Sequence, residues 1–198
     1  GVLLPPASGE GKLYVDSLQL EKGSMANRYN LLENGDFTEG TSGYTMNYAT
    51  SCAVIDVDNA KYAAARDTHP SFLDDTVYEM NGNVDNKIRI KQQATRGKAG
   101  ETYTFGAWIA SNKAAQTSQL CYYNGSSSHY VTYGIARIGI ELLNGNNEVI
   151  QSSFIDFAAD TDEWHYVSGT FTTTKTYYRL QLVVEYHRSI NTLYVDGL

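Results

Sequence analysis

Short runs of alternating apolar and polar residues, separated by turn residues, dominate this chain of 198 residues. A period of two is typical of β-strands that bury one face. Pairs such as Asn81-Gly82 and Asn144-Gly145 separate the runs and favour turns. No segment has the spacing of a long amphipathic helix, although Tyr62–Arg66 is suited to a single helical turn. The pattern therefore predicts an all-β protein.

Evenly spaced short strands with such turns indicate a β-sandwich or a barrel. The segment Ser118–Tyr133 is polar and rich in tyrosine, and we expect a long hairpin or loop there. The predicted strands are Ala53–Val57, Tyr78–Met80, Lys87–Gln92, Thr102–Ala110, Gly134–Leu143, Val149–Phe157, Trp164–Thr172 and Tyr177–Tyr186.

Composition and charge restrict the partners of the chain. Its formal net charge is −7 and its pI is about 5.0. This charge argues against binding to a nucleic-acid backbone or to an anionic membrane surface. No apolar run approaches the roughly 20 residues of a membrane helix, so we expect no membrane insertion. Cys52 and Cys121 fit either one disulfide or two buried thiols, and neither has the spacing of a zinc site.

The hexapeptide Leu193–Leu198 nearly repeats Leu13–Leu18, and the two copies lie about one domain length apart. We interpret the chain as one unit of a tandem array that carries the tail of the preceding unit. Residues 1–29 would be a linker and the closing strand of that preceding repeat. Residues 30–198 would then form the module itself, a monomer whose neighbours are further repeats of the same protein.

Four segments in order resemble the jelly-roll (galactose-binding-like) carbohydrate-binding modules. Asn30–Phe37 is similar to their opening N-G-x-F motif, and Ala99–Trp108 is similar to a central strand. Glu163–Thr172 and Leu193–Asp196 resemble two later strands. The resemblance implies a two-sheet antiparallel β-sandwich of jelly-roll topology, with the closing strand beside the opening one. It also implies that the ligand is an oligosaccharide or polysaccharide.

The segment Leu18–Asn30 has a narrower resemblance. It is similar to the linkers between modules of large Firmicute surface proteins of the Rhs/YD-repeat or wall-associated type. That likeness implies a secreted or cell-surface multidomain protein whose export signal lies outside this sequence.

A candidate binding face follows from strand alternation. In three predicted strands, one parity collects apolar residues such as Phe105, Ile138 and Leu182, and Tyr178 belongs to it. Sugar rings bind to aromatic faces, while planar polar side chains bind their hydroxyl groups. We therefore expect a concave sugar-binding groove on the opposite parity, although an ordinary solvated face has the same pattern. The candidate ligand-binding residues of this opposite parity are Trp108, Arg137, Glu141, Arg179, Gln181 and Glu185.

A second candidate site is the tyrosine-rich segment, with Tyr122, Tyr123 and Tyr130. Tyrosines on loops make rigid amphipathic contacts with ligands. The same residues would also serve to cover the rim of the sandwich. Both interpretations stay open at this point.

A structural calcium ion is the third expectation, and it comes from the resemblance. Jelly-roll modules of this type often hold Ca²⁺ between their opening and closing strands. Carried over by position, this nominates Asp36, Glu39 and Asp196, with backbone carbonyl oxygens as further ligands. The chain departs from the family pattern because Thr38 follows Phe37 where a glutamate is usual. Local hydrogen bonding of Asp36 and Asp196 is the alternative.

No catalytic motif is present, and the four histidines have no ligand spacing. We therefore expect no enzymatic activity. The predicted function is that of a non-catalytic carbohydrate-binding module of a secreted or surface-anchored bacterial protein. The alternative is a structural spacer in a tandem array, with no ligand.

Overall fold

The computed structural model describes residues 30–47, 49–82, 87–111, 120–123, 128–131, 135–157, 163–187 and 192–198. The chain divides into two units, Gly1–Asn30 and Leu31–Leu198, and the second is compact. The predicted strand Leu13–Leu18 lies outside the described residues. The assignment of residues 1–29 to a preceding repeat stays a prediction.

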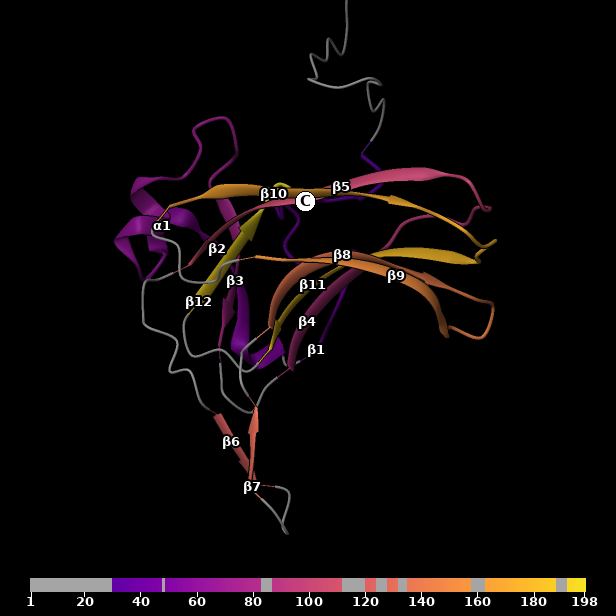
Figure 1. Ribbon diagram of the computed structural model, residues 1–198. Coiled ribbons are helices and arrows are strands. Elements are labelled where there is room, and N and C mark those ends of the chain that lie inside the picture. The colour runs from indigo at the N-terminus through magenta and orange to yellow at the C-terminus, as the bar shows by residue number, and fades with distance from the viewer. Residues whose placement is uncertain are drawn as a thin grey trace, which may run out of the picture. The chain divides into compact units, whose positions relative to one another are not determined.

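Two five-stranded antiparallel sheets form the fold (Figure 1). The first, which we call the β11 sheet, has the order β1-β4-β11-β8-β9, and the β12 sheet has the order β10-β5-β12-β3-β2. The strands of the β11 sheet are β1 (Tyr44–Asn47), β4 (Lys87–Gln93), β11 (Arg179–His187), β8 (Ile135–Leu143) and β9 (Val149–Asp156). Those of the β12 sheet are β10 (His165–Thr172), β5 (Thr102–Ser111), β12 (Thr192–Asp196), β3 (Thr76–Asn81) and β2 (Cys52–Asp56).

The smaller elements among the described residues are a hairpin and three short helices. The hairpin consists of β6 (Leu120–Tyr123) and β7 (Ser128–Val131), within the segment for which we expected a hairpin or loop. The helices are η1 (Ala49–Ser51), η2 (Val57–Asn59) and α1 (Ala63–Asp67). The helical turn expected at Tyr62–Arg66 is thus present, shifted by one residue.

These sheets confirm the predicted all-β jelly-roll sandwich. The opening segment is different from the expectation, because turns rather than a strand lead from Asn30 to β1. Asn34 and Phe37 have φ angles of 53° and 59°, which a regular strand excludes. The closing strand β12 lies between β3 and β5 instead of beside an opening strand, and the chain reaches the opening turn just after β12 ends. There the Leu198 N–H donates to the Gly35 carbonyl, with N···O 3.0 Å.

The main hydrophobic core fills the space between the two sheets. It includes the inward positions predicted from alternation, such as Phe105 on β5, Ile138 on β8 and Leu182 on β11. Tyr178 was predicted to belong to this set, and that prediction is wrong. It is 53% exposed because it precedes β11, and its N–H donates to the Leu143 carbonyl (2.8 Å).

A second apolar cluster covers part of the outer face of the β12 sheet. It joins Ala65 of α1 to Val77, Ala110 and Tyr194 on the sheet. Trp164 closes the cluster, and its indole Nε1–H donates to the Ala65 carbonyl at 2.7 Å. The segment around α1 therefore covers β2, β3, β12 and the end of β5 at Ala110. Thr102 and Thr104 of β5 and the outer positions of β10 stay exposed.

The burial contrast along β8 gives a stability test. Ile138 is 0% exposed in the core, whereas Ile135 on the same strand is 37% exposed. Ile138→Ala should lower the free energy of unfolding by about 2–5 kcal/mol, since it removes packed methyl groups and leaves a cavity. Ile135→Ala, the matched control, should cost less than about 1 kcal/mol. Urea denaturation measures both, and equal losses would contradict the assigned register.

Candidate functional site

The outer face of β11 is buried, although it points away from the core. Gln181, Val183 and Glu185 alternate with the core residues of this strand and are 1%, 0% and 5% exposed. Strand β11 lies at the centre of its sheet, with β4 on one side and β8 on the other. Both neighbours therefore place long side chains beside those of β11.

The pairing register brings charged residues of opposite sign directly across from each other. Glu185 is paired with Arg89 on β4 and with Arg137 on β8. Gln181 is paired with Glu141 on β8. Directly opposed residues on one sheet face have Cβ atoms about 5 Å apart, so their side chains meet.

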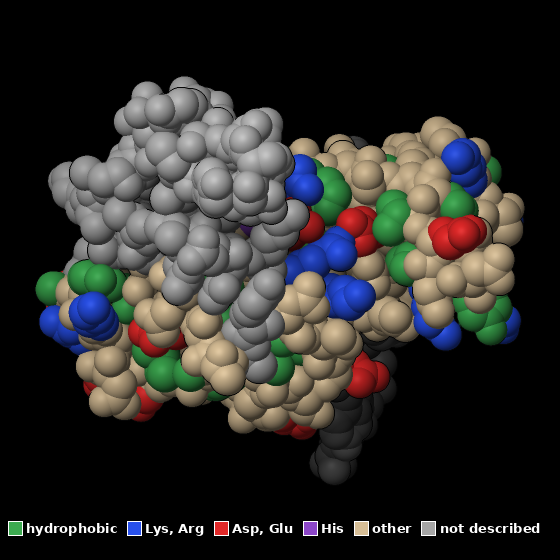
Figure 2. All heavy atoms as spheres, turned by 90° about the horizontal axis from the view of Figure 1, so that it is seen from below, with side chains coloured by type: hydrophobic (Ala, Val, Ile, Leu, Met, Phe, Trp, Pro, Cys, Tyr) green, Lys and Arg blue, Asp and Glu red, His purple; other side chains and the backbone are tan. Residues whose placement is uncertain are grey.

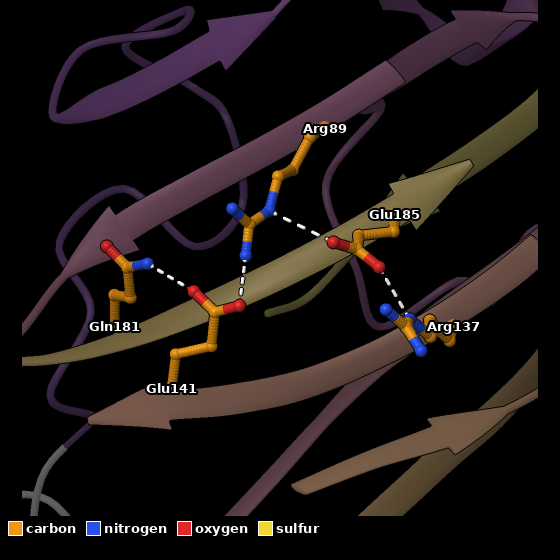
Figure 3. A network of polar contacts seen from close by, with 5 residues as sticks. All are labelled: Arg89, Arg137, Glu141, Gln181 and Glu185. Atoms are coloured by element: carbon orange, nitrogen blue, oxygen red, sulfur yellow. Dashed lines mark hydrogen bonds and ion pairs between the residues drawn. The ribbon is translucent and has the colours of Figure 1, made fainter. Parts of the chain in front are cut away.

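These five residues, Arg89, Arg137, Glu141, Gln181 and Glu185, form a continuous polar network (Figure 3). We call them the β11 network. Arg89 lies between the two carboxylates: its Nη2 bonds Glu141 Oε1, and its Nε lies 3.1 Å from Glu185 Oε1. Arg137 Nε donates to Glu185 Oε2, and Gln181 Nε2 donates to Glu141 Oε2 at 2.6 Å. Every carboxylate oxygen of the network thus has a nitrogen partner.

The network holds its charges with little contact to water. The carboxylate side chains of Glu141 and Glu185 are only 9% and 6% exposed, and two guanidinium groups balance their charge. Removal of an ion from water costs several kcal/mol unless partners compensate it. The shared Arg89 supplies that compensation to both carboxylates and fixes their orientation.

An aromatic ring completes this face beside Arg137. Phe154 on β9 lies opposite Gly139, and a Cβ atom on Gly139 would come within 2.5 Å of its ring. Glycine at this position therefore lets Phe154 lie flat on the sheet. The Arg137 guanidinium stacks over the ring at 4.1 Å from its centroid, a cation–π contact.

Figures 1 and 2 show how the face is presented. Strands β4, β11 and β8 curve together along their length in Figure 1. Figure 2 views the molecule from below, and basic and acidic side chains gather at the centre of the surface there. Fixed hydrogen-bonding groups on a sheet face can position the hydroxyl groups of a ligand without rearrangement.

The structure brings together four of the six residues predicted for the groove: Arg137, Glu141, Gln181 and Glu185. Trp108 is separate, because β5 belongs to the β12 sheet and its side chain lies on the opposite outer face. Arg179 lies at the beginning of β11, where its Nη1 bonds Asn147 Oδ1 and its guanidinium stands over Tyr178. The single groove that combined them is therefore incorrect.

Sequence reasoning missed Arg89. The alternation of Ile88, Arg89 and Ile90 within a predicted strand was the available signal, since it places Arg89 on the non-core parity. Tyr122, Tyr123 and Tyr130 belong to β6 and β7, but their side chains lie outside the described residues.

The predicted calcium ligands lie near one end of β12. Asp36 Oδ1 accepts hydrogen bonds from the Thr38 N–H and hydroxyl, and Glu39 is exposed. Asp196 is 0% exposed and contacts His69 Nε2 at 3.2 Å. Burial raises the pKa of Asp196 to about 7, and the charges of Asp74 and Asp36 add to this increase.

Within the described part of the chain, no group of three or more His, Cys, Asp or Glu side chains is placed to hold a metal ion. A calcium ion near Asp196 would thus depend on backbone carbonyl oxygens. Cys52 is a free thiol, and the side chain of Cys121 is outside the described residues. The helices found among the described residues are all too short or too polar to span a membrane.

Comparisons with known proteins support the fold. No protein-family model and no curated protein sequence matches this chain. Among solved structures, a family 16 carbohydrate-binding module is 18% identical with a TM-score of 0.52, over 84% of this chain and 96% of that one. TmCBM61, solved with β-1,4-galactotriose, is 13% identical with a TM-score of 0.51, over 85% and 95%.

The enzymatically active domain of the bacteriophage CBA120 tailspike protein 4 is also similar, with a TM-score of 0.57 at 11% identity. The match covers 85% of this chain but only 20% of the tailspike chain. The likenesses to the two carbohydrate-binding modules show that this chain shares their β-sandwich fold.

Loss of the central arginine should destabilise the fold. Arg89→Met leaves two carboxylates on the β11 sheet with fewer partners, and we expect a loss of about 2–3 kcal/mol in the free energy of unfolding. Lys91→Met, on the same strand and face, is the matched control and should cost less than about 1 kcal/mol. Thermal or urea denaturation compares the two variants. A loss for Lys91→Met as large as for Arg89→Met would show that the network adds nothing specific.

Divalent-ion removal tests the calcium prediction. An ion that binds only the folded chain raises its melting temperature, so EDTA should lower that temperature and added Ca²⁺ should restore it. Differential scanning calorimetry makes the measurement, with Mg²⁺ as the control ion. If the melting temperature does not change in EDTA, structural calcium is excluded.

Proposed function

We propose that this chain is a non-catalytic carbohydrate-binding module, and that the outer face of the β11 sheet binds the glycan. The observation that carries the proposal is the β11 network. Five polar side chains are held in fixed orientations on an outer sheet face, at a cost in desolvation that an ordinary solvated face would not bear. The likeness in fold to carbohydrate-binding modules supports the same function.

The chemistry of the face suits a polyol. Arg89 and Arg137 use only part of their five N–H donors each in the network, so donors remain for sugar hydroxyl oxygens. Gln181 is buried, and its Nε2 donates to Glu141 Oε2, which holds that carboxylate in place beneath the arginines. Because the carboxylates are already paired, the groups are oriented before the ligand arrives.

The Arg137–Phe154 stack would supply the apolar part of the contact. A sugar ring presents C–H groups on its faces, and these pack against the electron-rich face of an aromatic ring. The stack lies beside the polar network on adjacent strands, β8 and β9. One sugar residue can thus contact both.

We further propose that the module belongs to a tandem array in a secreted or surface-anchored bacterial protein. The near repetition of Leu13–Leu18 in Leu193–Leu198 supports the array. The second copy forms β12 and the end of the chain beside it, so the first copy is expected to be the equivalent strand of a neighbouring module.

Binding should depend on the stack. The chain is titrated by calorimetry with soluble glycans that include β-1,4-galactotriose. Arg137→Ala and Phe154→Ala should each raise the dissociation constant of a bound glycan about tenfold or more. A tenfold rise is a loss of about 1.4 kcal/mol in the free energy of binding. Tyr178→Ala removes an exposed ring elsewhere and is the control. Binding that survives both substitutions would place the site elsewhere, and no binding of any glycan would favour the structural spacer.

A further inference from the structure

A second surface of unusual composition lies on the opposite side of the sandwich, along β5 and its partner β10. Strand pairing places Thr104 beside Thr170, Gly106 beside Ser168 and Trp108 beside Tyr166. We call the outer positions of this pair the β5–β10 strip. Its eight members are Thr102, Thr104, Gly106 and Trp108 on β5, and Tyr166, Ser168, Thr170 and Thr172 on β10.

The strip carries no charged residue. Its Thr and Ser side chains are exposed, and those of Thr102 and Thr172 bond to each other at 3.0 Å between hydroxyl oxygens. Solvated sheet faces and edge strands are normally protected by charged side chains, and β10 is an edge strand. The chain has 37 charged residues, 15 basic and 22 acidic, so a row of eight uncharged positions on an outer sheet face is unusual for it.

Aromatic rings stand at one end of the strip. Trp108 packs against Tyr166 with ring centroids 5.6 Å apart, and against Phe72 of the loop before β3 at 5.5 Å. Phe72 is 72% exposed and Tyr166 is 51% exposed. Trp108 between them is partly buried. An exposed apolar patch that is rimmed by polar residues is typical of a binding surface.

The rings are held in place by the sheet beneath them. A Cβ atom on Gly106 would lie 2.4 Å from the Tyr166 hydroxyl oxygen, so glycine is needed for Tyr166 to lie along the strip. Trp108 in turn packs against the buried cluster around Trp164. The plane of Trp108 makes angles of 46° with that of Tyr166 and 66° with that of Phe72. The three rings are therefore not coplanar and do not form a flat platform.

We propose that the β5–β10 strip is a second glycan-binding surface, which takes a neutral linear polysaccharide along the two strands. The aromatic cluster packs against the C–H face of one sugar residue, and the row of hydroxyl groups bonds to the sugars that follow. From Thr102 to Trp108 the strip is about 20 Å long, at the rise of a β-strand, which is enough for several sugar residues. The absence of charge along the row selects against acidic polysaccharides, which need cationic partners.

This surface is independent of the β11 network, since the two lie on opposite outer faces of the sandwich. A chain with both would hold two glycan strands at once. In an array of such modules, each added module would raise the avidity for a multivalent polysaccharide without any new contact.

The test is affinity electrophoresis of the whole chain in gels that contain β-glucan, xylan, mannan or galactan, with polygalacturonate as the acidic comparison. The wild type should be retarded by at least one neutral polysaccharide. Phe72→Ala combined with Tyr166→Ala should abolish at least half of that retardation, whereas Tyr178→Ala should not change it. Both altered side chains are at least half exposed, and the melting temperature of each variant reports whether it is folded.

A second arm separates this surface from the β11 network. Polysaccharide bound to the strip should change the fluorescence of Trp108, since Trp108 belongs to the strip and Trp164 is buried. Arg137→Ala should leave this change intact. If Arg137→Ala abolishes all retardation while Phe72→Ala with Tyr166→Ala abolishes none, the strip is not a glycan site and only the β11 site stands. Absence of retardation by any neutral polysaccharide overturns the strip. Concentration-dependent dimerisation that the double variant abolishes would also overturn it, since a second copy of the chain would then be the occupant.

Discussion

Strand β11 is the constraint on which both the fold and the candidate site depend, because it is buried on both of its faces. Leu182 and Val184 pack into the core, while Gln181 and Glu185 join the polar network on the other side. A slip of one residue in register would place carboxylate and amide groups in the core and leucines among the arginines. The ion pairs and the hydrophobic contacts therefore favour the same register, and both would be lost in a shifted one.

The strands and the inward faces could be predicted from the sequence because a period of two is a local property. The partners of a strand are not local. Parity alone placed Trp108 with Arg137, although they belong to different sheets, since alternation indicates a face but not the sheet to which it belongs. Arg89 was missed for a related reason: it is important because it bridges Glu141 and Glu185, and both pairings are long-range. Tyr178 followed the parity of β11, but it lies before the strand begins.

The two outer faces of the sandwich differ in the side chains that they carry. One buries paired charges that are fixed by their neighbours, and the other presents uncharged hydroxyl groups beside exposed rings. Arginine and glutamate need partners to be held in a low-dielectric site, whereas threonine and serine on a flat strand do not. Under the proposals above, the first face would recognise a few hydroxyl groups in a fixed geometry, and the second would follow a repetitive chain.

The position of β12 between β3 and β5 has a consequence for how the protein forms. Both partners of β12 come much earlier in the chain, so during synthesis they wait with unpaired edges until residues 192–196 emerge. Until then the unpaired edges of β3 and β5 can pair with any strand of similar sequence. If the chain belongs to the tandem array proposed above, the nearest such strand belongs to a neighbouring module. The order of synthesis, and not only the final stability, then determines whether each module closes on its own strand.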